Sequence, residues 1–186
     1  MQLNTLSMVH AFLRQHVRPS AVCIDATAGK GRDTALLCRL AGENGRVLAF
    51  DIQPEAVEQT RALLAQEGLT AEVILDSHAN MEHYAAAESA DCVVFNFGRL
   101  PGGDPNIVTK ADSSLQAIDA GLRLLKSGGV MAIALYYGKE NGYEERDAVL
   151  AHLETLDDRK FSVLACRWSN RRNDPPMPIF IWKEAR

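Results

Sequence analysis

The sequence predicts an α/β fold, in which a mostly parallel seven-stranded sheet carries helices on both faces within a single domain over residues 1–186. Two observations lead to this prediction. Short apolar segments alternate with amphipathic helical ones up to Tyr136, which is typical of a parallel sheet covered by helices. Two more strand-like segments then close the chain with no helix between them, so we expect them to pair as an antiparallel hairpin.

The individual elements follow from apolar spacing and from the turn residues between the apolar segments. After an amphipathic helix at the N-terminus, the predicted helices are Arg32–Ala41, Pro54–Glu67, Met81–Ala87, Ser113–Leu125 and Tyr143–Leu156. The predicted strands are Ala21–Ala26, Arg46–Asp51, Ala71–Leu75, Asp91–Asn96, Val130–Tyr136, Phe161–Trp168 and Pro178–Lys183.

Composition and charge limit the classes of function. The chain is 47% hydrophobic and 24% charged, as in an ordinary globular domain, and its longest uncharged apolar run is too short to cross a membrane. The N-terminus has no signal-peptide pattern, so we expect a cytoplasmic protein. The net charge of −4 gives no overall positive field for nucleic acid, although a local basic group occurs at Arg167, Arg171 and Arg172.

The cysteines and histidines show no metal-ligand spacing, so we predict no metal site. The four cysteines, Cys23, Cys38, Cys92 and Cys166, are scattered along the chain. We expect free thiols that pack as small apolar side chains, because cytosolic thiols stay reduced.

The segment from Val22 to Thr34 is the first motif with chemical content. An apolar strand ends in Asp25 and passes through a small-residue turn into a helix. Such a turn places backbone N–H groups at the carboxyl edge of the sheet, where Gly29 and Gly31 would let a ligand approach closely. We expect a nucleotide-like ligand there, although a tight strand-to-helix turn alone explains the same residues equally well.

Polar residues also end the next three predicted strands. Asp51, followed by Ile52, ends the second strand, Ser77 and His78 follow the third, and Asn96 ends the fourth. An acid at the position of Asp51 can accept hydrogen bonds from both ribose hydroxyls of a nucleotide. Because ligands of open α/β sheets bind outside the carboxyl ends of the strands, these residues predict one crevice.

A dinucleotide and S-adenosylmethionine both suit such a crevice. The dinucleotide fingerprint requires a third glycine where this chain has Thr34, and the carboxylate of Asp25 would repel a pyrophosphate. An acid is better matched to the positively charged amino-acid and sulfonium end of S-adenosylmethionine. We therefore predict S-adenosylmethionine as the cofactor. The predicted binding residues are Asp25, Thr27, Gly29, Gly31, Asp33, Thr34, Asp51, Ile52, Ser77, His78 and Asn96.

Three motifs resemble one known family. They are Asp25-Ala26-Thr27-Ala28-Gly29-x-Gly31-x-Asp33-Thr34, Asn96-x-Gly98-x-Leu100-Pro101-Gly102-Gly103-Asp104 and Tyr137-Gly138-x-x-x-Gly142-x-Glu144-Glu145. Over nearly its whole length the chain is similar to the bacterial rRNA methylase family, which includes the MnmM-type tRNA methyltransferases. The resemblance implies a Rossmann-like class I methyltransferase fold and methyl transfer from S-adenosylmethionine to RNA.

The resemblance also implies a substrate and an assembly. In MnmM-type members the acceptor is the exocyclic amine of 5-aminomethyl-(2-thio)uridine at the tRNA wobble position, so the expected partner is the tRNA anticodon region. A homodimer is the expected assembly.

Three residues are candidates for catalysis at the acceptor. Methylation of an amine is mainly a positioning task once the amine is neutral. We predict that Asn96 orients the amine, that Asp104 accepts or attracts its proton, and that Tyr137 stacks on the target base. Asp104 could instead only cap its glycine-rich loop, because aspartate favours turns.

Other functions stay open on the sequence alone. The acidic chain has no appended RNA-binding domain, which leaves room for methylation of rRNA, a protein or a small-molecule amine. A non-catalytic RNA- or metabolite-binding module is the alternative outside the enzyme class.

Overall fold

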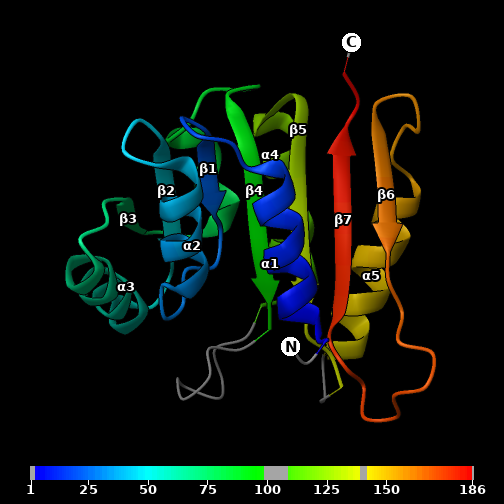
Figure 1. Ribbon diagram of the computed structural model, residues 1–186. Coiled ribbons are helices and arrows are strands. Elements are labelled where there is room, and N and C mark those ends of the chain that lie inside the picture. Colours follow the sequence, from blue (N-terminus) through cyan, green and yellow to red (C-terminus); the bar gives the residue numbers. More distant parts are fainter. Residues whose placement is uncertain (1–2, 99–108, 139–141, 186) are drawn as a thin grey trace.

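A seven-stranded sheet with the order β3-β2-β1-β4-β5-β7-β6 forms the centre of the computed structural model, which describes residues 3–98, 109–138 and 142–185 (Figure 1). Strands β1 to β5 pair in parallel, whereas β7 is antiparallel to both β5 and β6. The predicted fold class and the C-terminal hairpin are therefore confirmed. The strands are β1 (Val22–Asp25), β2 (Arg46–Asp51), β3 (Glu72–Leu75), β4 (Ala90–Phe97), β5 (Leu125–Leu135), β6 (Phe161–Ala165) and β7 (Met177–Lys183).

Helices cover both faces of the sheet, and the alternation of side chains along each strand decides which face each residue meets. Cys23 and Val47 belong to the apolar cluster under α1, α2 and α3, while their neighbours Ile24 and Leu48 belong to the cluster under α4 and α5. The helices are α1 (Thr5–His16), α2 (Arg32–Ala41), α3 (Pro54–Glu67), α4 (Ala111–Leu124) and α5 (Gly142–Glu154), with a 3₁₀ helix η1 (His78–His83).

Helix α1 lies across the middle of the sheet and begins at the edge where the parallel strands end (Figure 1). Asn4 and Ser7 form a capping box at its start, so its first backbone N–H groups are satisfied. The ring of Phe12 stacks on Phe180 of β7 with centroids 4.5 Å apart. This packing holds α1 against β7, and α1 also packs on the neighbouring strand β5.

The structure corrects three predicted boundaries. The helix predicted over Met81–Ala87 is wrong, because η1 starts earlier, where the Oγ of Ser77 accepts the N–H of Ala79. Strand β5 begins at Leu125 and its register with β4 shifts between Ala90 and Cys92. Strand β6 ends at Ala165, so the residues up to Trp168 belong to the following loop.

No helix in the described part of the chain combines the length and apolar character that a membrane span requires. All four cysteines are free, as predicted. Within residues 3–98, 109–138 and 142–185, no group of three or more His, Cys, Asp or Glu side chains could hold a metal ion.

Gly31 at the start of α2 allows α3 to approach the β1–α2 turn. Its φ is 77°, a left-handed conformation, and a Cβ added there would lie 2.9 Å from the Cα of Thr60 on α3. The hydroxyl of Thr60 also donates a hydrogen bond of 3.2 Å to the carbonyl of Gly29. The contact between turn and helix therefore requires glycine for two reasons, backbone conformation and space.

We expect Gly31→Ala to destabilise the protein more than Gly68→Ala. Both glycines have left-handed φ, 77° and 65°, but no atom lies within 4 Å of a Cβ added at Gly68. Each substitution costs about 1 kcal/mol of backbone strain, and Gly31→Ala adds about 1–3 kcal/mol because the backbone of Thr60 must move. Urea unfolding measures both losses, and equal losses would contradict the packing role of Gly31.

Candidate functional site

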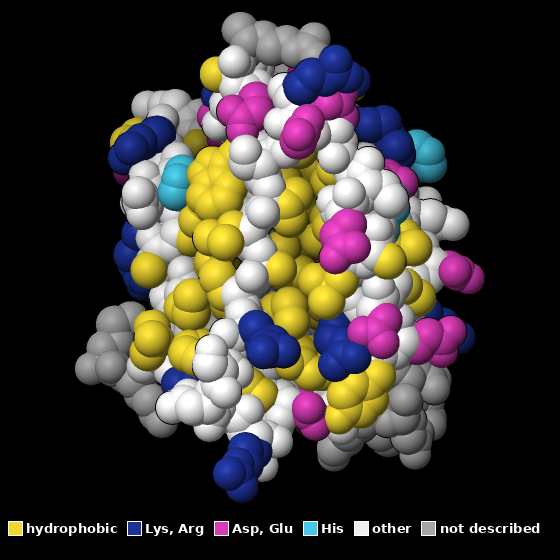
Figure 2. Space-filling model, turned by 90° about the vertical axis from the view of Figure 1, so that its right-hand side faces the viewer, with side chains coloured by type: hydrophobic (Ala, Val, Ile, Leu, Met, Phe, Trp, Pro, Cys, Tyr) yellow, Lys and Arg dark blue, Asp and Glu magenta, His cyan; other side chains and the backbone are white. Residues whose placement is uncertain are grey.

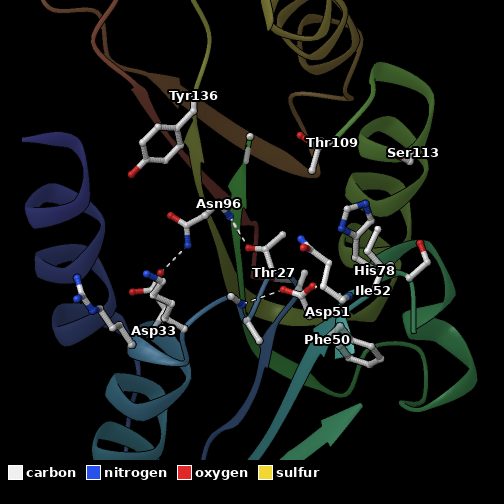
Figure 3. Close-up of a pocket in the computed structure, with 18 of the residues that line it drawn as sticks. Thr27, Asp33, Phe50, Asp51, Ile52, His78, Asn96, Thr109, Ser113 and Tyr136 are labelled. Atoms are coloured by element: carbon white, nitrogen blue, oxygen red, sulfur yellow. Dashed lines mark hydrogen bonds between the residues drawn. The ribbon is translucent and has the colours of Figure 1, made fainter. Parts of the chain in front are cut away.

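A cavity of about 610 Å³ opens at the carboxyl edge of the sheet (Figure 3). Its walls come from the β1–α2 turn, the residues after β2 and β3, the end of β4, and the starts of α1 and α4. The predicted crevice therefore exists. Of the residues predicted to bind the cofactor, its wall contains Thr27, Gly29, Asp33, Asp51, Ile52, Ser77, His78 and Asn96.

Asp25 and Thr34 lie beneath this wall and do not line the cavity, so their contact with the cofactor stays a prediction. Both side chains are fully buried, and the Thr34 hydroxyl donates a 2.6 Å hydrogen bond to Asp25 Oδ2. The N–H of Thr27 donates to Asp25 Oδ1. Burial, followed by the charge of nearby Asp33, raises the pKa of Asp25 to about 7. These two residues shape the turn, as Gly31 does, which also does not line the cavity.

Asp51 stands at one end of the cavity with its carboxylate held by the backbone. Its Oδ2 accepts the N–H of Gly29 and its Oδ1 accepts the N–H of Gln53, both at 2.9 Å. Each carboxylate oxygen still has a second lone pair, so the group can also accept hydrogen bonds from two hydroxyls of a ligand. Ile52, with 56% of its surface exposed, lines the cavity beside it, so an apolar wall adjoins the acceptor.

His78 lines the same end of the cavity. Burial lowers the pKa of its imidazole, so the ring is neutral at neutral pH and can both donate and accept a hydrogen bond. Its ring meets the ring of Phe97 edge to face, with centroids 5.9 Å apart. A neutral polar ring fixed by aromatic packing suits the edge of a purine base.

At the other end, Asp33 joins α1 to the end of β4. His10 Nε2 lies 2.6 Å from Asp33 Oδ1, and Asn96 Nδ2 donates a 2.5 Å hydrogen bond to Asp33 Oδ2. Because the carboxylate accepts, the amide nitrogen of Asn96 must face it, and Asn96 Oδ1 is directed to the opposite side. Figure 3 shows Asn96 between Asp33 and Tyr136 in this arrangement.

His10 was not predicted as part of the site. It lies on a helix outside the alternation of strands and helices, with no motif around it in the sequence. Only the packing of α1 on the sheet brings it to Asp33, and a helix N-terminal to the first strand gives no sequence signal for this contact.

Tyr136 lines the cavity and Tyr137 does not, and the stacking of Tyr137 on the target base stays a prediction. The ring of Tyr137 packs 6.0 Å from that of Tyr143, and the guanidinium of Arg146 lies 5.0 Å from its centroid. Gly98, with φ of 145°, makes room for Tyr136, because a Cβ on Gly98 would lie 2.8 Å from Tyr136 Cβ.

Burial and the neighbouring charge of Asp33 raise the pKa of Tyr136. Its phenol therefore keeps its proton at neutral pH, so the hydroxyl of this cavity residue can both donate and accept a hydrogen bond.

Thr109 supplies a polar atom in the cavity wall without a partner. Its hydroxyl is buried and makes no hydrogen bond to any described residue, a state that native proteins rarely leave unexplained. Its N–H donates to the carbonyl of Gly98 at 3.1 Å, so the two ends of the intervening segment meet. Asp104, the predicted proton acceptor, lies outside the described residues and stays a prediction.

Residues 47–182 match the model of the family described as "Putative rRNA methylase". The chain belongs to this rRNA methylase family. It is 34% identical over 186 residues to a chloroplastic tRNA (mnm5s2U34)-methyltransferase of Arabidopsis thaliana, a match that covers 94% of this chain and 67% of that protein.

Two crystal structures are similar over nearly their whole length. A "putative rRNA-methylase" from Clostridium thermocellum has 37% identity and a TM-score of 0.95, with 98% of this chain and 99% of the other covered. A "putative methyltransferase" from Streptococcus mutans in complex with SAH has 35% identity and a TM-score of 0.89 at the same coverage. With the fold, these likenesses make this rRNA methylase family member a methyltransferase that uses S-adenosylmethionine, with RNA as its substrate.

The cavity fits this cofactor. Its volume lies in the range of small-molecule sites, and it combines the apolar wall at Ile52 with polar groups at both ends. Asp51 would hold the ribose hydroxyls, His78 and Ile52 the adenine, and the wall between Thr27 and Asp33 the amino-acid end.

We expect Asp51→Ala to weaken binding of S-adenosylhomocysteine at least tenfold, because hydrogen bonds to a carboxylate contribute about 1.5–3 kcal/mol each. Isothermal titration calorimetry measures the change, and the thermal unfolding midpoint shows whether the variant is folded.

Asp119→Ala is the control, because Asp119 lies on α4, its Oδ1 lies 2.7 Å from His152 Nε2, and it does not line the cavity. Equal affinities for the two variants would show that Asp51 does not bind the cofactor.

Proposed function

We propose that this rRNA methylase family member N-methylates the aminomethyl group of 5-aminomethyl-(2-thio)uridine at the wobble position of tRNA, in the cytoplasm. The Arabidopsis thaliana relative named for this modification supports the substrate. The observation that carries the proposal is the orientation of Asn96, whose Nδ2 is bound to Asp33 so that Oδ1 is free to accept the N–H of an amine.

The described residues supply positioning and charge for this reaction. S-adenosylmethionine, when bound, would supply an electrophilic methyl group and leave as S-adenosylhomocysteine when its C–S bond breaks. The amine nitrogen, which forms the new N–C bond, would become a positively charged ammonium and then release one proton to solvent. Asn96 Oδ1 and the hydroxyl of Tyr136 can accept the N–H groups, which leaves the nitrogen lone pair directed elsewhere in the cavity. The carboxylate of Asp33, behind Asn96, stabilises the positive charge that develops on the methylated nitrogen.

We also propose that the protein forms a homodimer. Strand β6 is at the edge of the sheet, and its side chains Val163 and Leu164 are 37% and 51% exposed. Figure 2 shows hydrophobic side chains gathered on this side of the molecule. An exposed apolar edge strand is a surface that a second copy could cover.

The substrate is tested with tRNA from cells that make the aminomethyl uridine and lack its methylation. We expect purified protein and S-adenosylmethionine to add one methyl group to the wobble nucleoside, measured by mass spectrometry of digested tRNA. Methyl transfer to ribosomal RNA or to free amines, with none to tRNA, would contradict the proposal and favour the alternative acceptors.

We expect Asn96→Ala to lower kcat about 10²- to 10³-fold while the affinity for S-adenosylhomocysteine changes less than threefold. Loss of a positioned hydrogen-bond acceptor acts on the reacting amine and leaves Asp51 and His78 in place. Single-turnover kinetics on tRNA measures the loss, and a rate within threefold of wild type would exclude this role.

His10→Ala tests whether the orientation of Asn96 matters, because His10 acts only through Asp33. We expect a smaller loss, about tenfold, and no added loss when His10→Ala is combined with Asn96→Ala. Additive losses would show that His10 acts independently of Asn96.

A further inference from the structure

The β6–β7 loop, residues 166–176, is held in place by hydrogen bonds of Trp168, Pro176 and Asp174. The indole N–H of Trp168 donates to the carbonyl of Pro176 at 3.2 Å and to Thr5 Oγ1 at 3.4 Å. The hydroxyl of Thr5 also donates to the Pro176 carbonyl. At the far side, the Tyr143 hydroxyl donates to Asp174 Oδ2 at 2.6 Å. The loop is therefore fixed to the start of α1 and to α5.

Arg171 strengthens this attachment. Its guanidinium stacks 3.7 Å from the centroid of the Trp168 ring and donates to the carbonyl of Leu3 at 2.6 Å. Arg171 thus covers one face of the Trp168 indole, and the indole N–H is bound to Thr5 and Pro176. We therefore do not expect this ring to stack on a base. What the loop presents to solvent is its charge.

Arg167 and Arg172 are exposed and form no hydrogen bond or ion pair with any described residue. Their situation differs from that of Arg39, Arg46 and Arg123, each of which forms an ion pair with a glutamate. The carboxylate in the loop, Asp174, is occupied by Tyr143. The chain as a whole is acidic, yet Arg167 and Arg172 in this loop have no carboxylate partner among the described residues.

The loop lies beside the cavity. It is attached to Thr5, and the next residue, Leu6, lines the cavity wall. Lys30, Arg32 and Lys110 line the same cavity and also have no carboxylate partner in the described chain. Unpaired cations therefore occur both at the mouth of the cavity and on the loop next to it.

We propose that the β6–β7 loop is an RNA-docking element, in which Arg167 and Arg172 bind phosphates of the nucleotides flanking the one in the cavity. The proposal rests on the proposed RNA substrate and adds to it the surface that holds the RNA. Phosphate contacts by unpaired arginines fix the position of a nucleic acid without reading its sequence. A loop fixed at both sides can supply them with little loss of conformational freedom.

The test compares two double variants of equal charge. Arg167→Ala/Arg172→Ala removes the loop cations, and Arg14→Ala/Arg18→Ala removes two exposed arginines at the opposite end of α1, which also make no ion pair within the described residues. Binding of hypomodified tRNA is measured by fluorescence anisotropy over a series of salt concentrations, together with calorimetric binding of S-adenosylhomocysteine.

The slope of log K, the association constant for tRNA, against log salt concentration is negative, and each phosphate contact contributes about 0.7–0.9 to its magnitude. We expect the loop variant, which lacks two arginines, to have a slope about 1.5 smaller in magnitude than that of the wild type. This slope corresponds to about 30-fold weaker binding at 0.1 M salt, taking equal affinities at 1 M. The control variant should keep the wild-type slope, and both variants should bind S-adenosylhomocysteine as the wild type does, which shows that they are folded.

A loop variant with the slope and affinity of the control would overturn the proposal. Wild-type protein that binds no RNA would overturn it together with the RNA substrate. Wild-type protein that methylates ribosomal RNA and not tRNA would overturn only the proposed wobble nucleoside, and the same salt titration on that RNA then decides the role of the loop.

Discussion

The buried carboxylate of Asp25 sets the geometry on which the rest of the site depends. It accepts from the Thr34 hydroxyl and the Thr27 N–H, so the end of β1, the turn and the start of α2 form one unit. With that unit fixed, the N–H of Gly29 reaches Asp51, and Asp33 in the first turn of α2 reaches Asn96. Both ends of the cavity are therefore aligned by one internal hydrogen-bonded group that does not itself line the cavity.

Residues with the same sequence pattern have different roles here. Asp25 and Asp51 both end apolar strands, and either could be read from the sequence as a ligand contact. Their surroundings differ. Asp25 is completely buried and accepts a hydrogen bond from the Thr34 hydroxyl, whereas Asp51 lines the cavity. That difference depends on how α2 packs over the end of β1. An aspartate at the end of an apolar strand does not by itself indicate this packing.

The fold could be predicted almost entirely, because short apolar runs and helical periodicity mark most elements and the C-terminal pair of strands has no helix between them. Which of Tyr136 and Tyr137 lines the cavity could not be predicted from the sequence. Strand β5 is apolar and buried on both faces from Val130 to Leu135, so it has no alternation to show which side a following residue takes. The contact of His10 with Asp33 also arises only from tertiary packing.

Because β7 runs against β5, the connection between β6 and β7 returns to the edge where the parallel strands end (Figure 1). The loop lies outside the paired residues of β6 and β7, and it contains neither the glycine turn nor Asp51. Its length and composition can therefore change while the methyl-donor half of the molecule stays the same. In evolution or in protein engineering, exchange of the β6–β7 loop alone could change which nucleic acid a protein with this sheet binds.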